Sequence, residues 1–155
     1  MWVAVAIVIL ALLVANALWR RKQPSDDQEW PVYAGPVLSK AEQIMYHRLI
    51  KSFPDQRVLA QVALSQFVRV QKGVNFYKVF NRYNRLTADF VVCTPDFRVL
   101  AVLELDDRSH DRPRRLEADG RKAAVLHAAG IPLHRLNVNP MPGELELREL
   151  VKLDR

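Results

Sequence analysis

Two acidic residues lie within apolar segments that follow each other closely in the sequence. Asp89 belongs to the run at residues 87–94, and Glu104 belongs to the run at residues 98–106. If the two runs form a β-hairpin with a turn at Asp96 and Phe97 and no bulge, opposing residue numbers sum to 193 and Asp89 faces Glu104. Asp106, two residues beyond Glu104, then lies on the same face.

Carboxylates that face each other in this way need a compensating positive charge. Directly opposed side chains on neighbouring strands have Cβ atoms about 4.5–5.5 Å apart, and like charges at that separation destabilise a sheet. A divalent cation would offset the repulsion, and oxygen ligands suit Mg²⁺ or Mn²⁺. We therefore predict Asp89 and Glu104 as metal ligands. In the alternative interpretation, each acid is solvated or paired with a basic residue, and a register shift of one residue would separate the pair.

Capping and hydrophobic periodicity predict the elements that position these acids. Ser39 and Glu42 form a capping box that begins a helix extending to about Phe53. Residues 58–64 are predicted to form a strand, whereas residues 65–86 fit neither helix nor strand clearly.

The second half of the chain continues with a helix, a strand and a short helix. Residues 113–129 have helical spacing of apolar side chains, and Gly130 provides a C-cap. Residues 131–138 are predicted as a strand, and residues 144–151 as a short closing helix. The order predicts an α/β sandwich around a central mixed sheet, formed by residues 38–155.

An uncharged segment precedes this domain. Residues 2–19 would extend about 27 Å as a helix, and three basic residues follow at Arg20–Lys22. We expect a single transmembrane helix at 2–19, N-out, that anchors the domain on the cytoplasmic side of the inner membrane. A signal peptide cleaved after Ala17 is the alternative, although its positive charge would precede the apolar run. Residues 20–37 are predicted as a basic stop and Pro-rich linker.

Composition restricts the class of protein further. The 155 residues include 23 Lys and Arg and 17 Asp and Glu, for a formal net charge of +6. The single cysteine, Cys93, excludes a disulfide within the chain and a zinc site built from several cysteines. It lies in an apolar run and is expected to be buried.

Basic residues gather in two parts of the sequence, and aromatic residues lie among the first group. This composition is typical of contacts with nucleic-acid phosphates and bases, but anionic lipid beside a membrane anchor would explain the charge equally well. We predict four of the basic residues as nucleic-acid-binding: Arg82, Arg85, Arg121 and Lys122.

The ordered motifs resemble the core of the restriction-endonuclease-like PD-(D/E)XK nuclease superfamily. The resemblance rests on Ala88-Asp89-Phe-Val-Val, then Glu104-Leu-Asp106-Asp107-Arg-Ser-His110, and then Gly130-Ile-Pro-Leu-His-Arg-Leu136. It is strongest to the branch of the very-short-patch repair endonuclease and to a bacterial family of unknown function that shares the motif Glu-Leu-Asp-Asp-x-Ser-His. It covers residues 38–138.

The resemblance implies a role for each matching residue. Asp89 and Glu104 would bind the metal, and His110 would assist the attacking water. Asp106 occupies the position of the superfamily's usual lysine, which is a departure because an aspartate supplies no positive charge. Glu42 matches an acid on the first helix of many members, although its capping role explains it equally well.

Two basic residues on the predicted helix at 113–129 could supply the positive charge that Asp106 lacks. Arg121 or Lys122 could replace the lysine, or either could be a solvated helix charge. We expect metal-dependent hydrolysis of nucleic-acid phosphodiesters. The alternatives are an inactive nuclease-like fold that binds nucleic acid or a protein partner, and an adaptor on a lipid surface.

Overall fold

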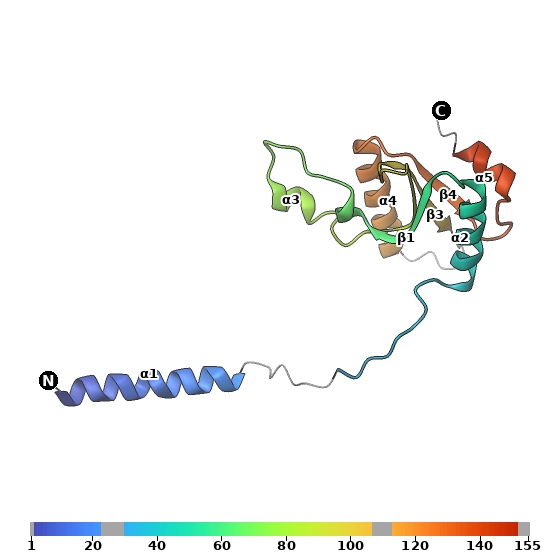
Figure 1. The fold of residues 1–155 in the computed structure, drawn as a ribbon. Coiled ribbons are helices and arrows are strands. Elements are labelled where there is room, and N and C mark those ends of the chain that lie inside the picture. Colours follow the sequence, from blue (N-terminus) through green and yellow to red (C-terminus); the bar gives the residue numbers. More distant parts are fainter. Residues whose placement is uncertain (1, 23–29, 107–112, 152–155) are drawn as a thin grey trace. The chain divides into compact units, whose positions relative to one another are not determined.

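The computed structural model describes residues 2–22, 30–106 and 113–151. The chain divides into two compact units, Met1–Gly35 and Pro36–Arg155. Helix α1 (Trp2–Lys22) belongs to the first unit, and all other helices and strands belong to the second (Figure 1).

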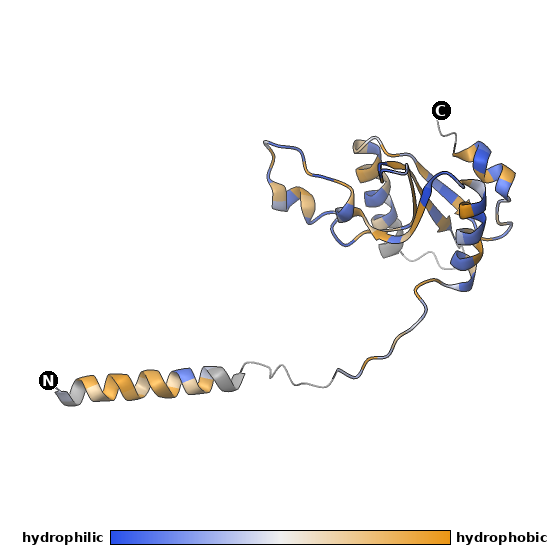
Figure 2. Cartoon of the chain, in the orientation of Figure 1, coloured by the Kyte–Doolittle hydropathy of each residue, from blue (hydrophilic) through white to orange (hydrophobic). Residues whose placement is uncertain are grey.

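Helix α1 is apolar along most of its length (Figure 2). Nevertheless, within the described ranges no helix is both long enough and apolar enough to cross a bilayer. This finding contradicts the predicted transmembrane helix at residues 2–19 and the predicted inner-membrane, N-out localisation. Asn16 interrupts the apolar run after Trp2–Ala15, and the helix ends in three basic residues, whereas a span requires about 20 consecutive, mainly apolar residues.

The second unit is a mixed α/β fold built on a four-stranded sheet in the order β1-β2-β3-β4. The strands are β1 (Arg57–Ala63), β2 (Thr87–Cys93), β3 (Val99–Asp106) and β4 (Leu133–Asn137). The pairs β1–β2 and β2–β3 are antiparallel, and β3–β4 is parallel. The parallel pair requires a crossover, and α4 (Pro113–Ala128) supplies it.

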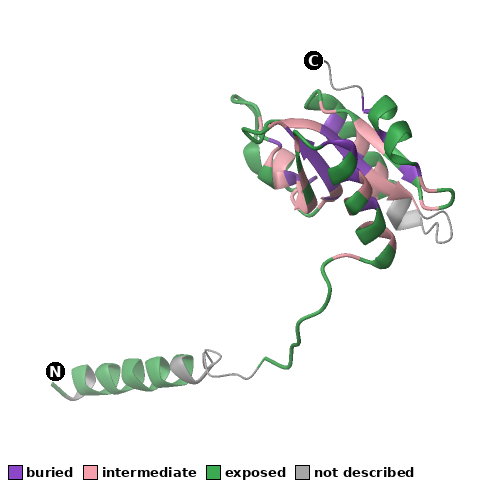
Figure 3. Cartoon of the chain, turned by 45° about the vertical axis from the view of Figure 1, so that its right-hand side comes forward, coloured by how far each residue is buried: buried purple, intermediate pink, exposed green. Residues whose placement is uncertain are grey.

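Helices cover both faces of the sheet. Helices α2 (Lys40–Ser52) and α5 (Glu144–Leu150) lie on one face and α4 lies on the other. Figure 3 shows that burial is concentrated in the strands and in the helix sides that face them. The core beneath α2 and α5 includes Met45, Leu49, Phe90, Val92, Leu103 and Leu147. The core beneath α4 includes Leu64, Tyr83, Val91, Val102 and Leu126.

The capping box predicted for α2 is confirmed. The main-chain N–H of Glu42 donates to Ser39 Oγ at 3.3 Å, and the N–H of Ser39 donates to Glu42 Oε2 at 2.6 Å. Arg48 farther along α2 donates to the carbonyl oxygens of Met141 and Pro142 at 2.8 and 2.7 Å. These bonds fix the segment that leads into α5.

The hairpin between β2 and β3 has the predicted register, but its turn and its pairing near the turn differ from the prediction. Thr94 N–H donates to the Arg98 carbonyl at 2.9 Å, so the loop has three residues, and Phe97 adopts a left-handed φ of 63°. This loop shifts the pairing by one residue, and a bulge at Leu100 shifts it back. Cys93 pairs with Val99 and Val92 pairs with Ala101, so Leu100 is the extra residue on β3. From Val92 to Phe90, the numbers of the paired residues sum to 193, as predicted.

The segment that the sequence left unassigned is a long connection from β1 to β2. It contains a 3₁₀ turn, η1 (Leu64–Gln66), and one short helix, α3 (Phe76–Phe80). Asn75 caps α3 by accepting a bond from the Lys78 N–H at 3.0 Å. The helix is too short to show the periodicity by which helices are recognised in a sequence.

Candidate functional site

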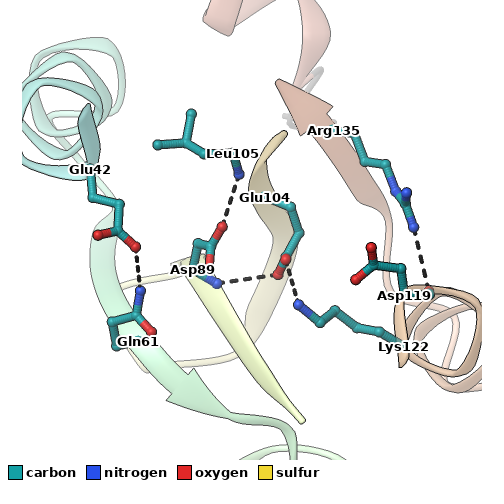
Figure 4. A network of polar contacts seen from close by, with 8 residues as sticks. All are labelled: Glu42, Gln61, Asp89, Glu104, Leu105, Asp119, Lys122 and Arg135. Carbon is teal, nitrogen blue, oxygen red and sulfur yellow. Dashed lines mark hydrogen bonds and ion pairs between the residues drawn. The ribbon is translucent and has the colours of Figure 1, made fainter. Parts of the chain in front are cut away.

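Asp89 and Glu104 meet where the β2–β3 ladder ends (Figure 4). Leu105 N–H donates to Asp89 Oδ2 at 2.9 Å, and Asp89 N–H donates to Glu104 Oε1 at 3.2 Å. Each carboxylate therefore accepts a bond from the main chain of the opposing strand. These charge-assisted bonds partly offset the cost of placing two like charges side by side.

Lys122 of α4 supplies the positive charge that this pair needs. Its ammonium group forms an ion pair and hydrogen bond with Glu104 Oε2. The side chains of Lys122 and Glu104 are only 11% and 15% exposed, so solvent screens the pair weakly. The interpretation of Lys122 as a solvated helix charge is therefore wrong.

The pKa of Glu104 is raised even with this lysine in contact. Burial of the carboxylate is the largest cause, the negative charge of Asp89 is the second, and Lys122 opposes both without outweighing them. An additional cation beside the two carboxylates would favour the charged form of Glu104. The electrostatics of the pair therefore suit cation binding.

Two residues of neighbouring elements flank the pair. Arg135 of β4 lies beside Glu104 in the parallel register, and its Nη2 donates to the Asp119 carbonyl oxygen at 3.4 Å. In Figure 4 the Asp119 side chain lies between Arg135 and Lys122. Strands β2, β3 and β4 and helix α4 thus all contribute charged groups on the face of the sheet that α4 covers.

The other predicted catalytic residues have separate outcomes. Asp106 is the last residue of β3 and pairs with Asn137 of β4, two residues beyond Glu104. His110 falls outside the described residues, so its predicted role stays a prediction. In the described ranges, no group of three or more His, Cys, Asp or Glu side chains is arranged to hold a metal ion. Two carboxylates are nevertheless a sufficient protein contribution for Mg²⁺, which usually retains waters or binds substrate phosphates.

Glu42 contacts β1 as well as its own helix cap. Its Oε1 accepts a bond from Gln61 Nε2 at 2.6 Å, while Oε2 accepts the capping bond from Ser39. Gln61 has a left-handed φ of 53° and lies opposite Asp89, between the paired residues Ala60 and Val62. A non-glycine residue in this conformation costs about 1–2 kcal/mol, and such strain often occurs at functional sites.

The predicted nucleic-acid-binding residues do not form one group. Lys122 contacts Glu104, whereas Arg82 and Arg121 line a cavity between the β1–β2 connection and the outer side of α4. Arg121 also pairs with Glu117 one helical turn earlier, at 2.6 Å. Arg85 is exposed in the connection.

The sequence matches one family model, described as a protein of unknown function (DUF2726), over residues 34–153. The chain belongs to this family. The match covers all of α2 to α5 and therefore every described residue of the candidate site. No curated protein and no solved structure matches the chain. The family description assigns no activity.

In this DUF2726 member, the sequence prediction does not include Gln61 among the site residues, and it leaves the role of Lys122 open. The signal for Lys122 was its position four residues before Leu126, which places both side chains on the core-facing side of α4. The signal for Gln61 was a lone amide within the apolar run at residues 58–64. Its positive φ has no sequence signal, because glycine and asparagine usually occupy such positions.

Proposed function

We propose that this DUF2726 domain hydrolyses nucleic-acid phosphodiester bonds with the aid of a divalent metal ion. The observation that supports the proposal is the arrangement of Asp89, Glu104 and Lys122. Two carboxylates on adjacent strands and a buried lysine on the neighbouring helix are joined by direct bonds. Such a combination of metal ligands and a positioned cation is suited to phosphoryl chemistry.

Asp89 and Glu104 would hold the Mg²⁺ or Mn²⁺ ion. Their oxygens match the ligand preference of these cations. Burial first and the charge of Asp89 second raise the pKa of Glu104, and a bound cation would oppose both effects. When bound, the metal would lower the pKa of a coordinated water and stabilise charge on the phosphate.

Lys122 would perform the role of the usual lysine of PD-(D/E)XK nucleases, whose position in this sequence is occupied by Asp106. The ammonium group reaches Glu104 from α4 instead of from β3. From that position it can orient the attacking water and stabilise developing negative charge on the phosphate oxygens. His110 would accept the proton from the water near neutral pH.

A nuclease-like domain that only binds nucleic acid is the second candidate. The observation that favours it is that Lys122 already neutralises part of the carboxylate charge within the chain. In such a domain the pair and its lysine would be structural, and Asp106 in place of the usual lysine would be tolerated. Metal binding separates the two candidates.

The test is a titration of the full chain with Mg²⁺ or Mn²⁺ while the melting temperature is followed. A ligand at about 100 times its Kd stabilises the folded state by about 2.7 kcal/mol, so binding raises the melting temperature. We expect this rise in the wild type and in Asp55→Asn, which alters an exposed carboxylate, but not in Asp89→Asn. Metal-dependent cleavage of labelled DNA or RNA should be lost in the same variant.

Three outcomes decide between the candidates. A metal-induced rise together with cleavage, both lost in Asp89→Asn, supports the hydrolase. Nucleic-acid binding without any response to metal supports the binding domain and excludes the hydrolase. An equal response in wild type and Asp89→Asn would show that the metal binds elsewhere, and it would also contradict the proposed site.

A further inference from the structure

The connection between β1 and β2 has an unusual composition. Adjacent antiparallel strands can be joined by two residues, yet 23 residues, 64–86, separate β1 from β2. The connection contains no Asp or Glu, and its basic residues are Arg69, Lys72, Lys78, Arg82 and Arg85. Most connections in compact domains have about 4–6 residues, so this one is unusually long.

A series of aromatic rings leads from the core of this connection to its surface. Tyr83 is 3% exposed, and its hydroxyl donates to the Val68 carbonyl at 3.3 Å. Phe80 packs edge-on against Tyr83 with ring centroids 5.6 Å apart, and Phe76 stacks on Phe80 at 5.0 Å. Phe76 and Tyr77 are 49% and 74% exposed. The buried end anchors the series, and the exposed end presents ring surface to solvent.

A groove separates the connection from the outer side of α4. Two adjoining cavities of about 260 and 590 Å³ share walls formed by Val79, Tyr83, Val125 and Ala128. The larger cavity lies within the range of about 300–1,000 Å³ that is typical of ligand pockets. Arg82 on one wall and Arg121 on the other place guanidinium groups beside a largely apolar surface, and Glu117, which also lines the larger cavity, pairs with Arg121.

Helix α4 joins this groove to the carboxylate site. Arg121 lines the groove, and the next residue, Lys122, faces the sheet and contacts Glu104. Gly120, which has no side chain, and Ala124, which has only a methyl group, lie on the groove side of the same helix and leave room for a planar group. A ligand in the groove would therefore lie one helix width from the candidate metal ligands.

We propose that this groove binds an unpaired segment of single-stranded nucleic acid, so that the preferred substrate is single-stranded or contains unpaired bases. The proposal rests on the hydrolase proposed above and names its substrate class. Exposed rings of Phe76 and Tyr77 offer stacking surfaces for bases, whose faces are hidden within a duplex. Arg82 and Arg121 are suited to the phosphates, since guanidinium groups bind them in a bidentate manner.

The rings and the charge together favour nucleic acid over other anionic partners. Phosphates alone would require only the basic residues, whereas the exposed, stacked rings of α3, the helix whose Val79 lines the groove, are suited to planar bases. A lipid surface is contacted by an amphipathic helix with a large apolar face, and α3 has only five residues. The complete absence of acidic residues from 64–86 removes repulsion along the whole connection.

The test measures binding of the full chain to fluorescein-labelled oligonucleotides of about 12 nucleotides, within the range of about 4–16 nucleotides covered by single-strand-binding folds. Single-stranded DNA, single-stranded RNA and duplex DNA are compared by fluorescence anisotropy in EDTA, which prevents cleavage. We expect both single strands to bind more tightly than the duplex. Tyr77→Ala should weaken single-strand binding by about 5- to 150-fold.

The control variant is Phe97→Ala, which removes an exposed ring from the β2–β3 loop and should leave Kd unchanged. Tyr77 is largely exposed, and a urea unfolding curve for Tyr77→Ala should match the wild type. Arg82→Gln should reduce the salt dependence of binding by about one phosphate contact, whereas Arg98→Gln, which alters the residue after Phe97, should not.

Two results would overturn the proposal. One is duplex binding as tight as single-strand binding with no effect of Tyr77→Ala. The other is capture of the chain by phosphatidylserine vesicles that is lost in Tyr77→Ala, which would assign the surface to lipid. The hydrolase is tested independently: Asp89→Asn should retain ring-dependent binding in EDTA, and a missing metal response would refute the hydrolase while leaving the groove intact.

Discussion

Lys122 controls the electrostatics of the carboxylate pair and, with it, part of the stability of the domain. A lysine at this depth is uncommon unless a carboxylate pairs with it. Here the pair stabilises α4 against the end of β3 and also keeps Glu104 in place beside Asp89. Structure and proposed chemistry therefore depend on the same side chain.

Replacing Lys122 with methionine should be costly. The substitution keeps most of the aliphatic length but leaves Glu104 without its cation, and breaking a buried ion pair in this way costs about 3–5 kcal/mol. We expect a loss near the lower end of that range, measured by urea unfolding in metal-free buffer. Lys51→Met is the matched control, since Lys51 lies 3.9 Å from Glu144 and is 69% exposed; exposed pairs contribute about 0–1 kcal/mol. Equal losses in the two variants would contradict a structural role for the Lys122 pair.

At the scale of the element, helix α2 shows how one acidic residue serves two contacts. Glu42 caps its own helix through Ser39 and reaches β1 through Gln61. The first contact follows from the sequence pattern, whereas the second depends on the strained conformation of Gln61. The sequence alone therefore left the capping and catalytic interpretations of Glu42 equally open.

Glu42→Gln separates these interpretations. Glutamine satisfies a capping box as well as glutamate does, so the stability of the domain should change by less than about 0.5 kcal/mol. Ser39→Ala, which removes the cap itself, should cost about 1 kcal/mol. If Glu42 contributes a charge to the metal site, Glu42→Gln should weaken the metal-induced rise in melting temperature while Ser39→Ala leaves it intact. A parallel loss of stability in both variants would point to capping alone.

The elements also show which features a sequence can predict. Helices α2 and α4 and strands β1 to β4 have strong capping or periodicity signals and were predicted to within a few residues. The β2–β3 register is confirmed although its prediction assumed that neither a three-residue loop nor a bulge is present, because both occur and their shifts cancel. The connection 64–86 was not predicted, since tertiary packing around Tyr83 determines its course. The transmembrane prediction relied on hydropathy of a single segment and is contradicted.

At the scale of the whole molecule, pH should alter stability through two groups whose effects on stability have opposite signs. Burial lowers the pKa of His134, which faces α5 and shares a small cavity with Glu149. His134 therefore binds a proton more readily in the unfolded chain. Stability then falls as the pH drops below the pKa of about 6.5 that histidine has in an unfolded chain. Glu104 has a raised pKa, so the folded state holds its proton more readily and stability rises as pH falls through that pKa.

A pair of variants isolates the histidine contribution. Between about pH 7.5 and pH 5.5, the difference in melting temperature between His134→Gln and the wild type should shift in favour of the variant as pH falls. His47→Gln provides the control, because His47 is exposed on α2. Both variants retain Glu104, so its opposing contribution cancels from the comparison. A difference that stays constant with pH would exclude His134 as a source of acid sensitivity.

The solitary cysteine gives the protein a built-in reporter of unfolding. Cys93 lies on β2, is 2% exposed, and has a thiol pKa that burial raises. A small alkylating reagent should therefore modify the chain only in molecules whose sheet has opened. Because each chain carries one thiol, a mass spectrum of a partly unfolded sample should show two peaks, unlabelled and singly labelled. Their ratio counts opened molecules directly, so every variant above can be ranked without an engineered label.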